Sequence, residues 1–218
     1  MKDIHKFGAE FLGTFAFVFV GVSATCNNIG PVGVALAHGL TIAVMVSALG
    51  HISGGHFNPA VTVGALVTGN IGVREAISYI FAQLLGAYIG ALTVKSSFSF
   101  LAYMPVNLGV PMLSTGTMVS TGIFIEFILT FFLLLVVFGT TMDSRGPQMG
   151  GLFVGLTVTL AMLAGGPITG ATMNPARAFG PALALGVWHH HFVYWIGPLL
   201  GGVIGALVYR RWIGQEGN

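Results

Sequence analysis

The chain alternates long apolar stretches with short turns that contain Gly, Pro or Asn. An α-helix needs roughly 20 mostly apolar residues to cross a bilayer. Six stretches fit this requirement, at about 7–25, 32–50, 75–95, 118–140, 149–166 and 190–210. The first has no small-residue cleavage site followed by a polar chain, so it is a membrane span and not a secretory signal. The pattern predicts an all-α membrane protein with six transmembrane helices.

Two further apolar stretches, about 58–68 and 174–184, are only half as long as a span. Each follows a Gly-rich segment and opens with Asn-Pro. Asn is a favoured helix N-cap and Pro suits the first helical turn, so we expect short re-entrant half-helices and not surface turns. Irregular backbone inside a membrane is tolerated only where protein buries it or where it lines a watery cavity. The segments 51–57 and 167–173 are therefore expected to line something wet.

The sequence repeats itself at a shift of 116 residues, falling to 115 near the end. The matches include Glu10-Phe11 with Glu126-Phe127, Asn58-Pro59-Ala60 with Asn174-Pro175-Ala176, Tyr79 with Tyr194, and the G-x-x-x-G pair Gly86/Gly90 with Gly201/Gly205. The halves, about 1–100 and 117–218, each hold three spans and one half-helix. Because three is odd, the repeat is inverted, and the half-helices should meet near the midplane. We expect one channel domain over 1–218, with the glycine pairs packing the halves together.

Composition agrees with a lipid-embedded chain. Only 6% of the residues are charged, against about a quarter in a soluble domain. The net charge of +2 is scattered, which gives no basis for nucleic-acid binding. The single Cys26 excludes an internal disulfide or a Cys-based metal site. No nucleophile constellation or metal-ligand spacing indicates an enzyme, a metal or a cofactor.

The positive charges orient the chain. With a cytoplasmic N-terminus, the inner segments contain Lys2, Lys6, Arg74, Arg145, Arg210 and Arg211. The outer segments then contain only Lys95, apart from Arg177. The positive-inside rule therefore predicts that both termini are cytoplasmic. Asp143 and Arg145 share an inner loop that is expected to be solvated. The short tails suggest a prokaryotic cell membrane.

The motifs "SGGHFNPAVT", "AEFLGTF" and "TGATMNPARAFGPA" resemble those of the aquaporin, or major intrinsic protein, family. The resemblance extends over nearly the whole chain, and two Asn-Pro-Ala boxes in inverted-repeat register are very specific. It implies a right-handed bundle of six tilted helices and two half-helices in membrane lipid. It also implies a homotetramer with one pore in each subunit.

The two Asn-Pro-Ala boxes, Asn58-Pro59-Ala60 and Asn174-Pro175-Ala176, would work through electrostatics. Each half-helix has roughly half a positive charge at its N-terminus, so cations would meet a barrier where the two ends face each other. The amides of Asn58 and Asn174 would donate hydrogen bonds to a passing water. Backbone carbonyls of 53–57 and 169–173 would accept hydrogen bonds, against an apolar opposite wall.

Two carboxyl groups lie within spans, and an intramembrane carboxylate is a candidate functional group. Glu10 and Glu126 are interpreted as anchors that accept hydrogen bonds from the loop backbones or from His56. The alternative is that they relay protons. The resemblance favours the anchors, because each half has one Glu beside one re-entrant loop.

The resemblance also places a selectivity filter at His38, Met162, Ala171 and Arg177. This set looks most like plant tonoplast intrinsic proteins, some of which pass ammonia, urea or hydrogen peroxide besides water. Met162 replaces a hydrogen-bonding His with a flexible, weakly polar side chain, which should relax strict selection for water. Glycerol is not expected, since Ala178 and Ala182 stand where glycerol facilitators have Asp and Lys.

The predicted function is a passive water channel that excludes protons and ions and has a filter loose enough for ammonia or other small neutral solutes. The alternative is an ion- or proton-coupled secondary transporter, which should have coupling acids in a midplane cavity. A charged His38 beside Arg177 would be repelled, so we expect a neutral His38. Gating by its titration is the other possibility.

Overall fold

The computed structural model describes residues 3–213, and the predicted inner charge Lys2 lies outside them. The long helices are α1 (Asp3–Cys26), α2 (Gly30–Ser53), α4 (Val73–Ser97), α6 (Val119–Val137), α7 (Gly150–Thr169) and α9 (Val193–Val208). Two π-helical turns, η2 (Phe138–Met142) and η3 (Tyr209–Ile213), continue α6 and α9. Within this range six helices are long and apolar enough to cross a membrane, as predicted.

The half-helices are α3 (Pro59–Val67) and α8 (Pro175–Leu185). The long connection at 96–117 contains two short helical turns, α5 (Phe100–Tyr103) and η1 (Asn107–Gly109).

The irregular segments are shorter than predicted. α2 extends to Ser53 and α7 to Thr169, so only 54–57 and 170–173 are irregular before the Asn-Pro pairs. Both helices end at a left-handed glycine, Gly54 with φ 93° and Gly170 with φ 85°. Each of these glycines donates its backbone N–H to the last turn of its helix, as is typical of a C-cap.

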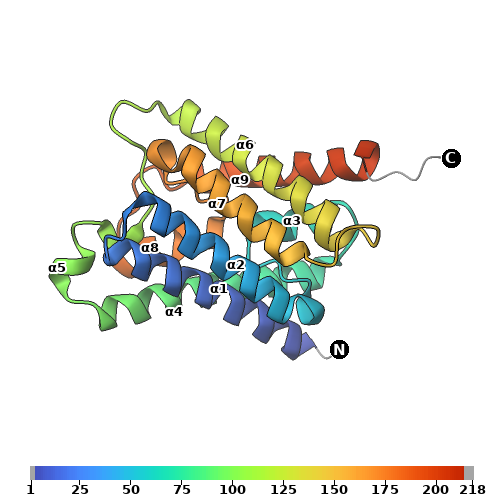
Figure 1. Cartoon of the computed structure of the whole chain (residues 1–218), viewed down its shortest axis with the longest axis horizontal. Helices are drawn as coiled ribbons and strands as arrows, with labels where there is room; N and C mark the ends of the chain where they lie inside the picture. Colours follow the sequence, from blue (N-terminus) through green and yellow to red (C-terminus); the bar gives the residue numbers. More distant parts are fainter. Residues whose placement is uncertain (1–2, 214–218) are drawn as a thin grey trace.

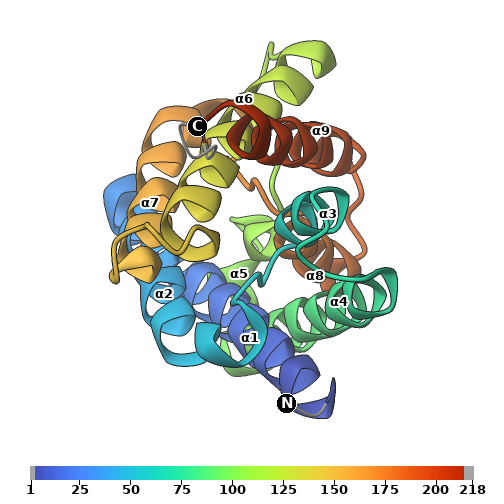
Figure 2. The ribbon, with the colours of Figure 1, turned by 90° about the vertical axis from the view of Figure 1, so that its right-hand side faces the viewer.

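The packing repeats the symmetry of the sequence. α1 packs on α2 and α4 as α6 packs on α7 and α9, and α8 lies on α4 as α3 lies on α9. The two ends of the described chain lie at the same end of the bundle (Figure 1). Viewed from that end, α3 lies in front of α8, inside the ring of long helices (Figure 2). The half-helices therefore enter from opposite ends, as the inverted repeat predicts.

The predicted glycine pairs do permit close helix crossings, but these crossings do not join the two halves. A Cβ on Gly86 would clash with the carbonyl of Phe11, and one on Gly201 with the carbonyl of Phe127. These crossings join α4 to α1 and α9 to α6, so they lie within each half. The expectation that the glycine pairs join the halves is wrong. α2 and α7 make the main helix contact between halves.

At the α2–α7 crossing, the two helices approach through Gly39 and Gly155. A Cβ on Gly155 would clash with the carbonyl of Gly39 and lie 2.6 Å from Cβ of Ala43. Small residues allow this close backbone approach, which supplies packing where lipid offers no hydrophobic drive between helices. The outer faces of other helices instead expose large apolar side chains such as Phe81 on α4 (63%).

The loop between α6 and α7 is largely exposed, as expected, and hydrogen bonds also tie it down. Arg145 donates from Nε to Asp143 Oδ1 (2.9 Å), and Tyr209 on η3 donates to Asp143 Oδ2 (2.9 Å). These hydrogen bonds lower the pKa of Asp143 below its ordinary value, and those from Arg145 have the largest effect. The loop is thereby linked to the end of the last helix.

Gly155→Ala tests the crossing between the halves. The added methyl overpacks the α2–α7 contact, so we expect a loss of about 1–3 kcal/mol in the free energy of unfolding, relative to Gly166→Ala. Gly166 lies on the same helix and has open space around its position. Unfolding of the purified proteins in detergent measures the difference, and equal midpoints for the two variants would contradict the packing argument.

Candidate functional site

The two Asn-Pro-Ala boxes meet inside the bundle. Nδ2 of Asn58 donates to the carbonyl of Met173 (2.8 Å), and Nδ2 of Asn174 donates to the carbonyl of Phe57 (2.9 Å). Each Oδ1 caps its own half-helix, accepting from the backbone N–H of Ala60 or its counterpart. An amide nitrogen has two hydrogens. One hydrogen on each Asn therefore fixes the opposite loop, and the other is left for the passage.

This geometry strains the backbone. Phe57 and Met173, which precede the two Asn residues, have φ of 48° and 51°. Ala171 has φ 46° where the first half has Gly55. Non-glycine residues in the left-handed region cost free energy and persist only where the surroundings enforce them. At both boxes the strain turns a backbone carbonyl toward the opposite Asn.

A buried carboxylate holds each loop in place. Glu10 on α1 is fully buried and accepts four hydrogen bonds. The donors are Ser53 Oγ (2.6 Å), the backbone N–H of His56 (2.9 Å), the backbone N–H of Phe57 (2.7 Å) and Gln83 Nε2 (2.7 Å). The backbone N–H groups of His56 and Phe57 are thus satisfied inside the membrane.

The second loop has the same arrangement. Glu126 on α6 accepts from Thr169 Oγ1 (2.7 Å), the backbone N–H of Thr172 (2.9 Å), Thr172 Oγ1 (3.1 Å) and the backbone N–H of Met173 (2.8 Å). Both carboxylates occupy their four acceptor positions with loop or helix donors. This geometry fits the anchoring role.

His56 takes part through its backbone and not through its ring. Its Nδ1 lies 3.1 Å from Oγ1 of Thr62, whose hydroxyl donates to the carbonyl of Asn58 (3.1 Å). Thr62 therefore accepts from the imidazole, so Nδ1 carries the hydrogen. Glu10 therefore accepts from His56, as expected, through the backbone N–H.

Sequence reasoning missed two tyrosines that hold the loops. Tyr79 donates to the carbonyl of Ser53 (2.7 Å), and Tyr194 donates to the carbonyl of Thr169 (2.9 Å). Both rings are buried. The repeat aligned these tyrosines, which was the available signal, but only the fold shows their partners.

Arg177 is buried at the outer side of the Asn pair. Its Nη1 donates to the carbonyl of Gly109 in the long outer connection (2.7 Å). Its Nη2 lies 3.4 Å from Nε2 of His38, whose Nδ1 lies 2.9 Å from the carbonyl of Val34. A carbonyl only accepts, so Nδ1 of His38 carries the hydrogen and Nε2 offers a lone pair toward the guanidinium. The neutral ring satisfies both contacts.

The other two predicted filter residues are Met162 and Ala171. Met162 and Arg177 both line an outer cavity of about 500 Å³. A separate inner cavity of about 30 Å³ contains the two Asn side chains, and the cavities share no lining residue. His38 and Ala171 are buried and line neither of these two cavities.

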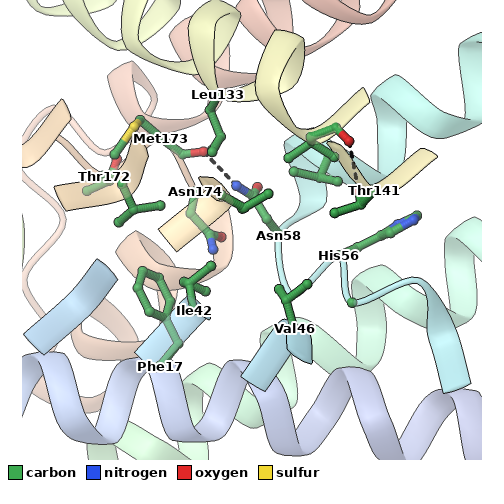
Figure 3. Close-up of a pocket in the computed structure, with 15 residues that line it drawn as sticks. Phe17, Ile42, Val46, His56, Asn58, Leu133, Thr141, Thr172, Met173 and Asn174 are labelled. Atoms are coloured by element: carbon green, nitrogen blue, oxygen red, sulfur yellow. Dashed lines mark hydrogen bonds between the residues drawn. The ribbon is translucent and has the colours of Figure 1, made fainter. Parts of the chain in front are cut away.

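The inner cavity has a polar and an apolar wall. Asn58, Asn174 and the loop residue Thr172 lie on one side. Phe17 from α1 and Ile42 from α2 lie on another side, and Leu133 from α6 lies beyond the Asn pair (Figure 3). At roughly 10–15 Å³ for each water, the space holds about two waters. This size suits single-file passage.

A positively charged side chain lies near the C-terminus of each half-helix. Lys95 donates to the carbonyl of Ala184 in the last turn of α8 (2.7 Å). Arg210, its counterpart in the repeat, lies beside Gly69 at the end of α3. Positive charge is favourable at a helix C-terminus, so both half-helices are stabilised at the end away from the Asn pair. The position of Lys95 explains the one positive charge predicted outside.

Comparison with known proteins agrees with this geometry. The family described as major intrinsic protein matches residues 1–209. The chain is 46% identical to "Aquaporin TIP4-4" of Zea mays over 214 residues, covering 92% of this chain and 83% of the relative. It is 42% identical to human "Aquaporin-2", covering 93% and 76%. An X-ray structure of the aquaglyceroporin from Plasmodium falciparum superposes with a TM-score of 0.87 at 26% identity, covering 97% of both chains.

The comparisons also indicate where in the cell the protein is located. They support an integral, multi-pass membrane protein. The relatives named here come from a plant, an animal and a protozoan parasite. The predicted prokaryotic membrane therefore gains no support.

Glu126→Gln tests the anchoring role. The introduced amide replaces one carboxylate oxygen by an NH2 donor, which faces the backbone N–H of either Thr172 or Met173, while the amide oxygen still accepts from the other. At about 1–3 kcal/mol for the buried N–H left unsatisfied, we expect a loss of about 1–3 kcal/mol in the free energy of unfolding. Unfolding in detergent measures it, and Glu10→Gln should behave alike by symmetry.

Glu75→Gln is the matched control. Glu75 forms a partly exposed ion pair with Lys6 (2.7 Å), which contributes at most about 1 kcal/mol. A Glu126→Gln protein as stable as the Glu75→Gln protein would rule out the anchor. If Glu126→Gln instead abolished a proton flux present in the unsubstituted protein, the carboxylate would be a proton relay.

Proposed function

Because the chain belongs to the major intrinsic protein family, we propose that it is a passive water channel, and not an enzyme, that excludes protons and ions. The observation that carries the proposal is the reciprocal bonding of Asn58 and Asn174 to the opposite loops. It holds two helix N-termini together around a cavity of water-file size.

Cations are excluded by fixed positive potential. The starts of α3 and α8 each present roughly half an elementary charge to the midplane. Arg177 adds a full charge at the outer constriction, in surroundings that screen it poorly. Neutral water meets no comparable barrier.

Protons are excluded because the water file is oriented. The second amide hydrogens of Asn58 and Asn174 donate to a water at the midplane, which then cannot readily accept a proton from its neighbour. The loop carbonyls at 54–56 and 170–172 serve as acceptors on either side. The apolar wall opposite the loops keeps water from lingering.

The filter admits small neutral solutes besides water. His38 and Arg177 provide its polar groups, Ala171 is small, and Met162 is flexible and weakly polar. Ammonia fits this combination, as do urea and hydrogen peroxide. The tonoplast-type name of the maize relative supports this assignment.

The assembly that we propose is the one that the family resemblance implies. We propose one channel domain over 1–218, a homotetramer with a pore in each subunit, and both termini on the cytoplasmic side. Lys6 is on the first turn of α1, and Arg74 lies 3.8 Å from Asp3. Asp143, which binds Arg145, accepts from Tyr209 on η3. These inner charges therefore lie near the two ends of the described chain, which are at the same end of the bundle (Figure 1). This arrangement agrees with the positive-inside rule.

Reconstituted liposomes test the water channel. We expect osmotic shrinkage well above that of empty liposomes, with no proton flux. Arg177→Val removes the charge at the constriction, so proton or cation flux should appear while water permeability stays within about twofold, since water carries no charge. Stopped-flow light scattering and a trapped pH dye measure the two fluxes.

Shrinkage no faster than in empty liposomes would refute the water channel. Uptake of a solute against its gradient would instead favour the coupled transporter. Arg177→Lys keeps the charge and serves as the control for Arg177→Val.

Methylammonium flux tests the loose filter. We expect the unsubstituted protein to pass it and Met162→His to lower its flux relative to water, because a rigid ring narrows the passage and adds a hydrogen-bonding group. Leu160→His introduces the same ring two positions earlier on α7, at a side chain that is 65% exposed and does not line the outer cavity, and it should leave the flux unchanged. If the ratio of methylammonium flux to water flux were the same for the unsubstituted protein and Met162→His, this role of Met162 would be contradicted.

A further inference from the structure

The inverted repeat assigns every filter residue a counterpart on the inner side of the Asn pair. A shift of 116 takes His38 to Val154, Met162 to Val46, Ala171 to Gly55 and Arg177 to Val61. The outer set has two hydrogen-bonding side chains and one charge. The inner set has three valines and a glycine.

The fold brings all four counterparts to one place. They all line the inner cavity of about 30 Å³. Val46, Val61 and Val154 are almost fully buried, with exposed fractions of 8%, 3% and 6%. A Cβ on Gly55 would lie 3.4 Å from Cγ1 of Val46, so the loop backbone and this valine are close together.

This section lies between the Asn pair and the inner mouth. His56 and Thr141 line both the inner cavity and a further cavity of about 310 Å³ that opens beside Lys6 and Glu75. The hydroxyl hydrogen of Thr141 is used within the protein, since it donates to the carbonyl of Val137 (2.7 Å), and Nδ1 of His56 is bonded to Thr62. Val46, Val61 and Val154 line the same cavity as the Asn pair and these two side chains, so water leaving the Asn pair inward passes beside the valines.

We propose that Val46, Val61 and Val154 form a second, apolar constriction whose wetting limits the rate of water passage. Confined water needs two to four polar partners, and valine supplies none. Apolar constrictions in channels resist wetting for this reason. The outer filter then selects what enters, and its inner counterpart sets how fast water passes. This inference rests on the proposed water channel.

Isosteric substitution separates the effect of wetting on water permeability from the effect of the width of the constriction. Val46→Thr and Val154→Thr keep the side-chain shape and add a hydroxyl. A helical Thr donates to the carbonyl four residues earlier, as Thr41 does to Ala37 on the same helix (2.6 Å), and keeps lone pairs that accept from water. We expect each variant to raise water permeability per reconstituted subunit at least twofold, with no proton flux.

Val44→Thr is the matched control. Val44 lies on α2 with Val46 but is 63% exposed on the outside of the bundle. The Val44→Thr variant should leave water permeability unchanged. Val46→Leu, which adds apolar bulk, should lower water permeability, whereas Val44→Leu should not.

The outcomes are distinguishable. If the unsubstituted protein conducts water and both threonine variants match Val44→Thr or conduct less, the second constriction is refuted and the water channel stands. If the unsubstituted protein conducts no better than empty liposomes, the proposed function itself fails. Quantifying folded protein in each liposome sample removes differences in yield.

Discussion

The structure depends on satisfying irregular backbone inside a membrane. Hydrocarbon offers no hydrogen bonds, so each bare N–H or carbonyl there costs several kcal/mol. The two re-entrant loops meet this constraint with carboxylates from neighbouring helices. Glu10 and Glu126 each accept two backbone N–H groups, and tyrosine hydroxyls bind the carbonyls at the loop starts. With those demands met, other polar groups can face a passage.

Reciprocity between the halves gives the passage its geometry. Each Asn caps its own half-helix and fixes the opposite loop, so neither box can move without the other. The positive φ values of Phe57 and Met173 are tolerated because the surrounding bonds determine the backbone. Two weak helix dipoles become effective because this bonding holds both within one narrow section.

In the proposed channel, selectivity would come from departures from the symmetry. The scaffold residues repeat nearly unchanged, whereas Arg177 and His38 have apolar counterparts in the other half. The polar constriction is therefore at the outer side alone. The long outer connection contributes as well, since the carbonyl of Gly109 orients the Arg177 guanidinium. A scaffold duplicated for stability thus supports two different ends of one pore.

The sequence by itself determined the number of spans, the two half-helices and their opposed entry, because apolar length, Asn-Pro caps and an odd repeat are local or periodic properties. Its motifs also indicated both boxes, both carboxylates and the filter positions. Only the tertiary structure decided that Gly39 and Gly155 join the halves, that Tyr79 and Tyr194 hold the loops, and that one amide hydrogen of each Asn binds the opposite loop. These features depend on which backbone groups come within hydrogen-bond or van der Waals distance, and those distances are set by helix crossing and not by spacing along the chain.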